Sequence, residues 1–218
     1  MKVYKMKVKL PALAVLGTVG YAAYMGAFSK PKVDTGYYPG AHHFFYKEVQ
    51  TSLRNTGQEF KKFMDQIEAN PGIVPKDQPG KTLRYKPVRI CYDDPKKLVN
   101  EKESRMVIGV EVEEHLGDNM VQTILAADTD LKLAELPLSE SAKTKFPLVN
   151  TLSYILGPMK AYPAMEEYLG KDVQRDDGMT MERYERDAGQ IEFYAGFDKS
   201  AHERLAALMP IEKPAYLK

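Results

Sequence analysis

The chain has 218 residues, and its 31 Lys and Arg against 30 Asp and Glu leave a formal net charge of +1. This length fits one membrane helix and one domain of about 150 to 180 residues, but leaves too little for two soluble domains. The balanced charge lacks the basic excess of nucleic-acid-binding proteins, so neither DNA nor RNA is an expected partner. The single cysteine, Cys91, excludes an internal disulfide and a cysteine-based zinc site, and we expect it to be a buried structural side chain.

The first feature along the chain is a run of 19 uncharged residues over positions 10–28, LPALAVLGTVGYAAYMGAF. At about 1.5 Å per residue, a helix of this length crosses a hydrocarbon core of about 30 Å. The run is longer than the apolar part of a signal peptide, and it lacks the polar stripe of a helix in a soluble core. We therefore predict one membrane-spanning helix over residues 10–28, after a basic N-terminus over 1–9 and before a linker over 29–36.

Small side chains recur at every fourth position of this predicted helix, at Ala14, Thr18, Ala22 and Gly26. Such a face lets a second membrane helix approach closely, so other membrane-protein subunits are expected partners beside membrane lipid. The alternative is that Gly and Ala are simply common in membrane helices.

Aromatic residues at the end of the run, Tyr21, Tyr24 and Phe28, are placed to form a belt at the membrane surface. The flanking lysines favour a cytoplasmic N-terminus. The endoplasmic reticulum and the mitochondrial inner membrane both stay open as locations.

Strand and helix patterns alternate through the rest of the chain. Residues 37–49 are rich in β-forming side chains, and residues 53–67 repeat apolar side chains at helical spacing. A loop over 71–87 follows. The later predicted elements are strands over 88–92 and 106–113, a short helix over 121–127, strands over 131–138 and 142–146, a long helix over 148–169, and a hairpin over 181–186 and 190–197. Pro158 and Pro163 are expected to break or kink the long helix.

The order strand, helix, strand, strand therefore occurs twice, which we interpret as an internal duplication of about 90 residues. The expected fold class is α+β, with two βαββ repeats whose helices lie on one face of a sheet and leave a groove on the other. This domain is predicted over residues 37–198, with a C-terminal docking tail over 199–218. Within the tail, Ser200 and Glu203 fit a capping box if Ser200 is the N-cap of a short helix.

Four segments resemble parts of GyrI-like domains: GYYPGAHHFFYKEVQ, RICYDDPKKL, TKFPLVNTLSYILGPMKAYPAMEEYLGK and MERYERDAGQIEFYAGF. GyrI-like domains are the duplicated-fold relatives of the DNA gyrase inhibitory protein and of bacterial multidrug-sensing effector domains. The likeness is closest to the testis-expressed ER-phagy receptor family, which places one membrane helix ahead of such a domain. That family works through a long, acidic, disordered tail that this sequence does not show, so an autophagy role is not expected.

The resemblance implies a ligand site, because in ligand-binding relatives a carboxylate of the last strand faces the groove and meets cationic aromatic molecules. Glu192 looks like the matching position, and strand alternation places Tyr194 on its face and Ile191 and Phe193 on the core side. A carboxylate beside aromatic rings attracts a cation. The other residues expected at the groove are Glu111, as the counterpart of Glu192 in the first half, and Tyr38, Tyr92 and Tyr184. The alternative for both glutamates is an ordinary solvated strand face.

No other motif in the sequence points to chemistry: the histidines lack metal-ligand spacing, and there is no phosphate loop or nucleophile elbow. We therefore predict no catalytic residue, no metal site and no cofactor. The predicted function is a single-pass, membrane-anchored, non-enzymatic GyrI-like binding or scaffold module. The alternatives are an accessory structural subunit of a large membrane complex and a groove-type hydrolase of reactive small molecules.

Overall fold

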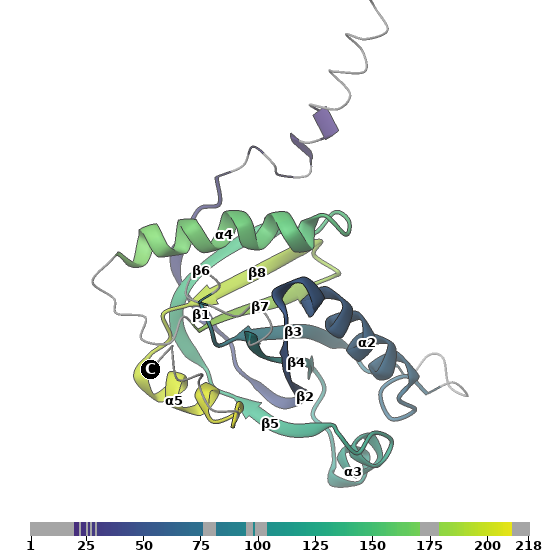
Figure 1. Ribbon diagram of the computed structural model, residues 1–218. Helices are drawn as coiled ribbons and strands as arrows, with labels where there is room; N and C mark the ends of the chain where they lie inside the picture. The colour runs from purple at the N-terminus through teal and green to yellow at the C-terminus, as the bar shows by residue number, and fades with distance from the viewer. Residues whose placement is uncertain are drawn as a thin grey trace, which may run out of the picture.

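The computed structural model describes residues 30–75, 82–94, 98, 104–170 and 179–210, together with residues 20, 21, 23, 24, 26 and 28. Its strands are β1 (Asp34–Tyr38), β2 (Ala41–Thr51), β3 (Tyr85–Cys91), β4 (Ser104–Val112), β5 (Lys132–Leu136), β6 (Ser139–Pro147), β7 (Thr180–Glu185) and β8 (Gln190–Ala195). Its helices are the 3-10 turn η1 (Leu53–Asn55) and the α-helices α2 (Thr56–Ala69), α3 (Asp118–Ala126), α4 (Ser153–Leu169) and α5 (Lys199–Ala206). Together they form one curled sheet with helices packed on it (Figure 1).

The sheet has the strand order β1-β6-β8-β7-β3-β4-β2-β5, and every neighbouring pair is antiparallel. This order is symmetric about the β7–β3 pair. The first repeat is β2-α2-β3-β4 and the second is β6-α4-β7-β8, so the predicted α+β duplication is confirmed. The flanking strands are exchanged, because β1 pairs with β6 of the second repeat and β5 pairs with β2 of the first.

The single strand predicted over 37–49 is in fact two strands, β1 and β2, separated at Gly40. Gly40 has a φ of +75°, and a Cβ there would lie 2.9 Å from the backbone oxygen of Leu136 and the backbone nitrogen of Leu138. Only glycine meets both conditions without strain. Because β1 begins at Asp34, the domain also starts inside the segment predicted as a linker over 29–36.

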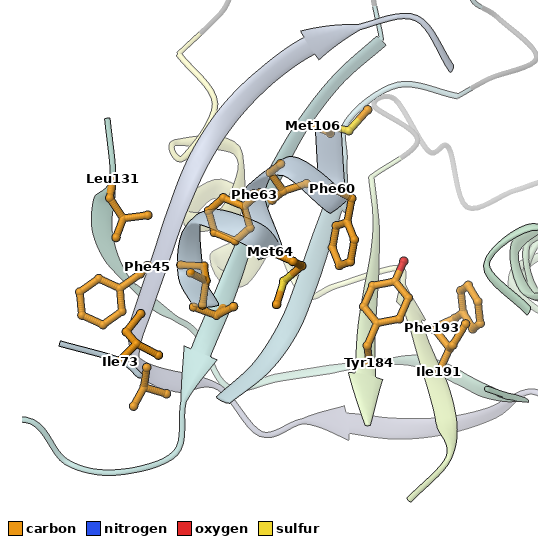
Figure 2. Close-up of a cluster of buried hydrophobic side chains, with 14 of the residues drawn as sticks. Phe45, Phe60, Phe63, Met64, Ile73, Met106, Leu131, Tyr184, Ile191 and Phe193 are labelled. Atoms are coloured by element: carbon orange, nitrogen blue, oxygen red, sulfur yellow. The ribbon is translucent and has the colours of Figure 1, made fainter. Parts of the chain in front are cut away.

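Two hydrophobic clusters lie on opposite faces of the sheet. We call the side packed by α2 and α4 the helix face, and the side packed by α5 the tail face. Figure 2 shows the helix-face cluster, in which Phe60, Phe63 and Met64 of α2 cover Phe45 and Met106 of the strands. On the tail face, Leu205, Leu208 and Met209 pack with Val88 of β3 and with Tyr92, which directly follows that strand. Both faces are therefore covered, at least in part, by other elements of the same chain.

Helix α4 runs from Ser153 to Leu169 with Pro158 and Pro163 inside it. The prolines were predicted to break or kink this helix, and the break is therefore wrong, although each proline removes one backbone hydrogen bond. Packing on the sheet compensates, because Gly157 allows a close approach: a Cβ at this position would lie 3.0 Å from Cζ of Phe193. Tertiary contact thus outweighs the local preference of the sequence.

Most of the predicted membrane helix over 10–28 lies outside the described residues, and so do Ala14, Thr18 and Ala22 of its small-residue face. Among the residues that the structure does describe, no helix has the length and apolar character needed to cross a membrane. Gly26 lies in a turn with a φ of +75°, and its N–H donates to the carbonyl of Ala23 at 2.9 Å. Helical geometry therefore ends before Gly26, short of the predicted end at residue 28.

Candidate functional site

The two glutamates that the sequence placed at the groove are both on the tail face, and both are buried. Glu111 on β4 is 3% exposed and Glu192 on β8 is 4% exposed. The alternative of a solvated strand face is therefore wrong for both. A buried carboxylate needs a cation or hydrogen-bond donors, so the partners of each define what this site can do.

Glu111 has two partners from distant strands. The hydroxyl of Tyr38 donates to its Oε1, and Nε of Arg183 donates to its Oε2 at 2.8 Å. Burial raises the pKa of Glu111, and the neighbouring Arg183 opposes this change. Burial and the nearby Glu111 carboxylate also raise the pKa of the Tyr38 phenol well above its usual value.

Glu192 is held more strongly in its ionised form. Tyr194 donates to its Oε2 at 2.5 Å, and Nζ of Lys143 and of Lys145 lie 2.9 Å and 3.3 Å from its Oε1. Burial alone would raise the pKa of Glu192, but the hydrogen bonds from Tyr194 and the lysines outweigh it and lower the pKa to about 2. The Lys143 ammonium also sits 4.9 Å from the ring centroid of Tyr194. The cation beside a carboxylate and an aromatic ring is thus supplied by the chain itself.

Arg183 on β7 joins the two glutamates into one network. Its Nη1 lies 2.5 Å from Oε1 of Glu185 and 3.5 Å from Oε2 of Glu192. Its Nε donates to Oε2 of Glu111. The rings of Tyr38 and Tyr194 meet edge to face with centroids 5.3 Å apart. The structure therefore brings together four of the predicted residues: Glu192, Tyr194, Glu111 and Tyr38.

The remaining two predicted residues lie elsewhere. Tyr92 is on the tail face but under α5, where its hydroxyl donates to the backbone oxygen of Leu205 at 2.8 Å. Tyr184 is on the opposite, helix face, where its ring lies 5.1 Å from that of Phe60. The placement of Tyr184 in the groove wall is thus wrong. Strand β7 is covered on both sides, so its apolar residues do not reveal which side faces the groove.

Helix α5 is anchored onto the tail face by its cap. Asp198, rather than Ser200, is the N-cap residue: its Oδ1 accepts from the backbone N–H of Ala201 at 3.0 Å. Its Oδ2 accepts from the hydroxyl of Ser139 on β6 at 2.8 Å. The capping box at Ser200 and Glu203 is therefore a wrong prediction, because the helix starts two residues earlier than that box requires.

A second charged cluster, on the helix face, was not anticipated from the sequence. Glu182 on β7 is 1% exposed, and Nη2 of Arg89 lies 2.6 Å from each of its oxygens. The hydroxyls of Tyr162 and Tyr184 donate to the same carboxylate, that of Tyr184 at 2.5 Å. Arg89 and Glu182 are adjacent across the β3–β7 pair but 93 positions apart in the chain, so no local pattern links them.

Cys91 lies at the edge of this helix-face cluster. Burial raises its pKa to about 11, with the charge of Glu182 adding to the effect. A thiol in this condition stays protonated near neutral pH and is a poor nucleophile. This agrees with the structural role expected for Cys91.

Neither cluster has the form of a metal site. Among the described residues, no group of three or more His, Cys, Asp or Glu side chains is arranged to hold a metal ion. The carboxylates are instead balanced by Lys and Arg. In both clusters the carboxylates form ion pairs with Lys or Arg side chains of neighbouring strands.

Comparison with solved structures supports the fold class. A hydrolase from Listeria innocua matches with 10% identity and a TM-score of 0.50, over 82% of this chain and 98% of that one. The EcmrR C-terminal domain matches with 14% identity and a TM-score of 0.43, over 78% of this chain and 98% of that one. SAV2435 bound to tetraphenylphosphonium matches with 8% identity and a TM-score of 0.45, over 80% of this chain and 98% of that one.

The Listeria innocua hydrolase, with a TM-score of 0.50 at 10% identity, shows a shared fold alone. The curled antiparallel sheet with its helices fits the GyrI-like fold. No protein-family model and no curated protein sequence matches the chain.

Proposed function

We propose that this chain is a non-enzymatic GyrI-like binding and scaffold module, held to a membrane by the predicted helix over residues 10–28. The fold supports the GyrI-like part of this proposal. The membrane part rests on the uncharged run of the sequence, and the endoplasmic reticulum and the mitochondrial inner membrane are its two candidate locations.

One observation carries the non-enzymatic part: each central carboxylate is already paired with a cation of the same domain. Glu182 pairs with Arg89, Glu192 with Lys143, and Glu111 with Arg183. A general base, or an acceptor for a cationic ligand, needs a carboxylate that is free to engage its substrate. Removing one partner from a buried ion pair costs about 3 to 5 kcal/mol. An incoming cation would have to offset that cost, so internal pairing favours a scaffold.

Tetraphenylphosphonium, a lipophilic aromatic cation, tests this proposal against the ligand site expected at Glu192. We expect the melting temperature of the full chain in mild detergent to stay unchanged as the cation is added. The matched variants are E192Q, which removes the candidate acceptor, and E140Q, which alters an exposed glutamate on the neighbouring strand β6. A concentration-dependent rise that E192Q abolishes and E140Q keeps would restore the cation site and overturn the inference that internal pairing leaves Glu192 only a scaffold role.

The anchor is tested separately by extraction of cell membranes at alkaline pH. The full chain is expected in the membrane pellet, and a variant with two lysines in the run, Leu13→Lys with Val19→Lys, is expected in the supernatant. Release of the unmodified chain into the supernatant would rule out the anchor. Fractionation of the same cells assigns the compartment.

An accessory subunit of a larger membrane complex is the second candidate function. The four-residue spacing of Ala14, Thr18 and Ala22 favours it, because small side chains let membrane helices pack closely. Native electrophoresis after mild-detergent extraction separates the two candidates. A discrete large complex supports the subunit, whereas migration as a monomer or dimer supports the independent module.

A further inference from the structure

Helices α2 and α4 occupy equivalent places in the two repeats, yet their outer surfaces differ. The outer surface of α2 is charged, with Lys61 paired to Asp65 at 2.7 Å and Lys62 paired to Glu59 at 2.8 Å. Its inner surface is apolar and packs on the sheet. This is the pattern expected of a helix with one side in water.

The outer surface of the first half of α4 is apolar instead, while the last turns carry the exposed Glu166 and Glu167. Leu152, Ile155 and Met159 follow one another at helical spacing and are 52%, 58% and 65% exposed. The inner side of the same helix buries small and apolar residues, including Ala161 and Met165. A stretch of helix that is apolar on both sides is expected to be covered on both, and an exposed apolar patch marks an interaction surface. The outer face of α4 therefore requires a partner that α2 does not.

Described residues of the N-terminal segment contact both ends of this helix. Nδ2 of Asn150, just before α4, donates to the hydroxyl of Tyr21 at 2.6 Å. Towards the other end, Nζ of Lys30 lies 3.5 Å from Glu167, and the hydroxyls of Thr35 and Tyr168 lie 2.7 Å apart. Figure 1 shows the described residues between positions 20 and 28 on the outer side of α4. The end of the uncharged run and the apolar face of α4 are thus neighbours.

The aromatic side chains of that segment point to the kind of partner. Tyr21, Tyr24 and Phe28 are all exposed, at 53%, 67% and 69%. Tyrosine concentrates at membrane surfaces, where its ring meets apolar chains and its hydroxyl meets water. Five residues separate Phe28 from the start of β1 at Asp34, and the six steps from Phe28 to Asp34 span at most roughly 20 Å. An anchored domain is therefore held close to the bilayer surface.

We propose that the outer face of α4, defined by Leu152, Ile155 and Met159, lies in the interfacial layer of the bilayer beside Tyr21, Tyr24 and Phe28. The occupant of this face is lipid. The proposal rests on the membrane anchor proposed above, and it adds a fixed orientation: α4 faces the membrane, and the charged outer surface of α2 does not enter it. The domain then has two contacts with the bilayer instead of a single flexible tether.

Site-specific labelling of the full chain in phosphatidylcholine vesicles tests this orientation. In a C91S background, single cysteines replace Ile155, Met159 or the exposed Gln122 of α3, and each is labelled with an environment-sensitive fluorophore. Ile155 and Met159 are exposed, so these substitutions leave the core intact, and Gln122 is the control on an element distant from α4 (Figure 1). Quenching is measured with spin-labelled lipid and with aqueous iodide.

We expect labels at 155 and 159 to be quenched severalfold more by the spin-labelled lipid than the label at 122, and the label at 122 to be quenched by iodide. If the chain floats with the vesicles but iodide quenches all three labels alike, α4 faces water and the inference is overturned while the anchor stands. If labels at 155 and 159 are shielded from both quenchers, a protein covers the face, and the lipid assignment is overturned. If the chain does not float with the vesicles, the anchor itself fails.

Discussion

Glu192→Gln is expected to destabilise the fold by an amount that depends on pH. In the folded chain the pKa of Glu192 is about 2, below its usual value of 4.5, because the hydrogen bonds from Tyr194 and the nearby lysines outweigh the opposing effect of burial. A lowered folded-state pKa contributes stability above the unfolded pKa, and that stability is lost as the pH falls towards the folded value. The loss should therefore occur between about pH 4.5 and pH 2.

The magnitude follows from the size of the pKa change. A change of about 2.5 units corresponds to about 3 kcal/mol of unfolding free energy at pH 7, and the same linkage leaves about 1 kcal/mol at pH 3. Glu192→Gln removes the charge, so its destabilising effect should shrink from about 3 to about 1 kcal/mol over this range. The buried position of the side chain, with 6% of its surface exposed, keeps solvent screening small.

Urea unfolding of the full chain in mild detergent, followed by far-ultraviolet circular dichroism, measures both values, since the sequence contains no tryptophan for fluorescence. E140Q is the matched control, because Glu140 is exposed on β6 and should change the unfolding free energy by about 0.5 kcal/mol or less at either pH. Equal destabilisation by Glu192→Gln at pH 7 and pH 3 would refute the account of Glu192 as an ion-paired carboxylate.

Three further changes test other contacts by the same unfolding assay. Arg89→Met should lower the free energy of unfolding by about 3 kcal/mol or more, because it leaves Glu182 buried without its cation. Adding Glu182→Gln to this variant should recover part of the lost stability. If the two effects were additive, the two residues would not be coupled. Asp198→Ala should cost about 1 kcal/mol and Ser200→Ala almost nothing, and the reverse order would restore the capping box. Tyr92→Phe should cost about 1 kcal/mol and speed hydrogen exchange in α5, and unchanged exchange would show that its bond to Leu205 does not hold the helix down.

The elements were largely predictable because helical and strand periods are local. The apolar spacing of Phe60, Phe63, Met64 and Ile67 predicted α2, and all four of these side chains are buried. Alternation along β8 predicted that Glu192 and Tyr194 share one face, and they are hydrogen-bonded there. The duplication followed from the order of the elements, and the symmetric strand order of the sheet agrees with it.

The burial of both faces of the central strands was not predictable, for a physical reason. Alternation along β4 predicted the side of Glu111 but not that this side is covered as well, and β7 is covered from both sides, so hydrophobicity along β7 carries no signal of direction. The sequence therefore leaves a solvated face open for Glu111 and Glu192, and it predicts the wrong face for Tyr184. Helix α5 covers part of the tail face, and this covering was not predictable either, because it depends on contacts with strands far away in the sequence.

The sequence alone thus determined which residues form strands and helices, that the chain is duplicated, and which acidic and aromatic side chains share a strand face. These properties depend on neighbours a few positions apart. Only the tertiary structure decided the partners of the charges. Arg89 and Glu182 are 93 positions apart, and Arg183 and Glu111 are 72 apart, so they meet only when the two repeats join at the β3–β7 pair. A charge that its own fold neutralises cannot be distinguished in the sequence from one that is left for a ligand.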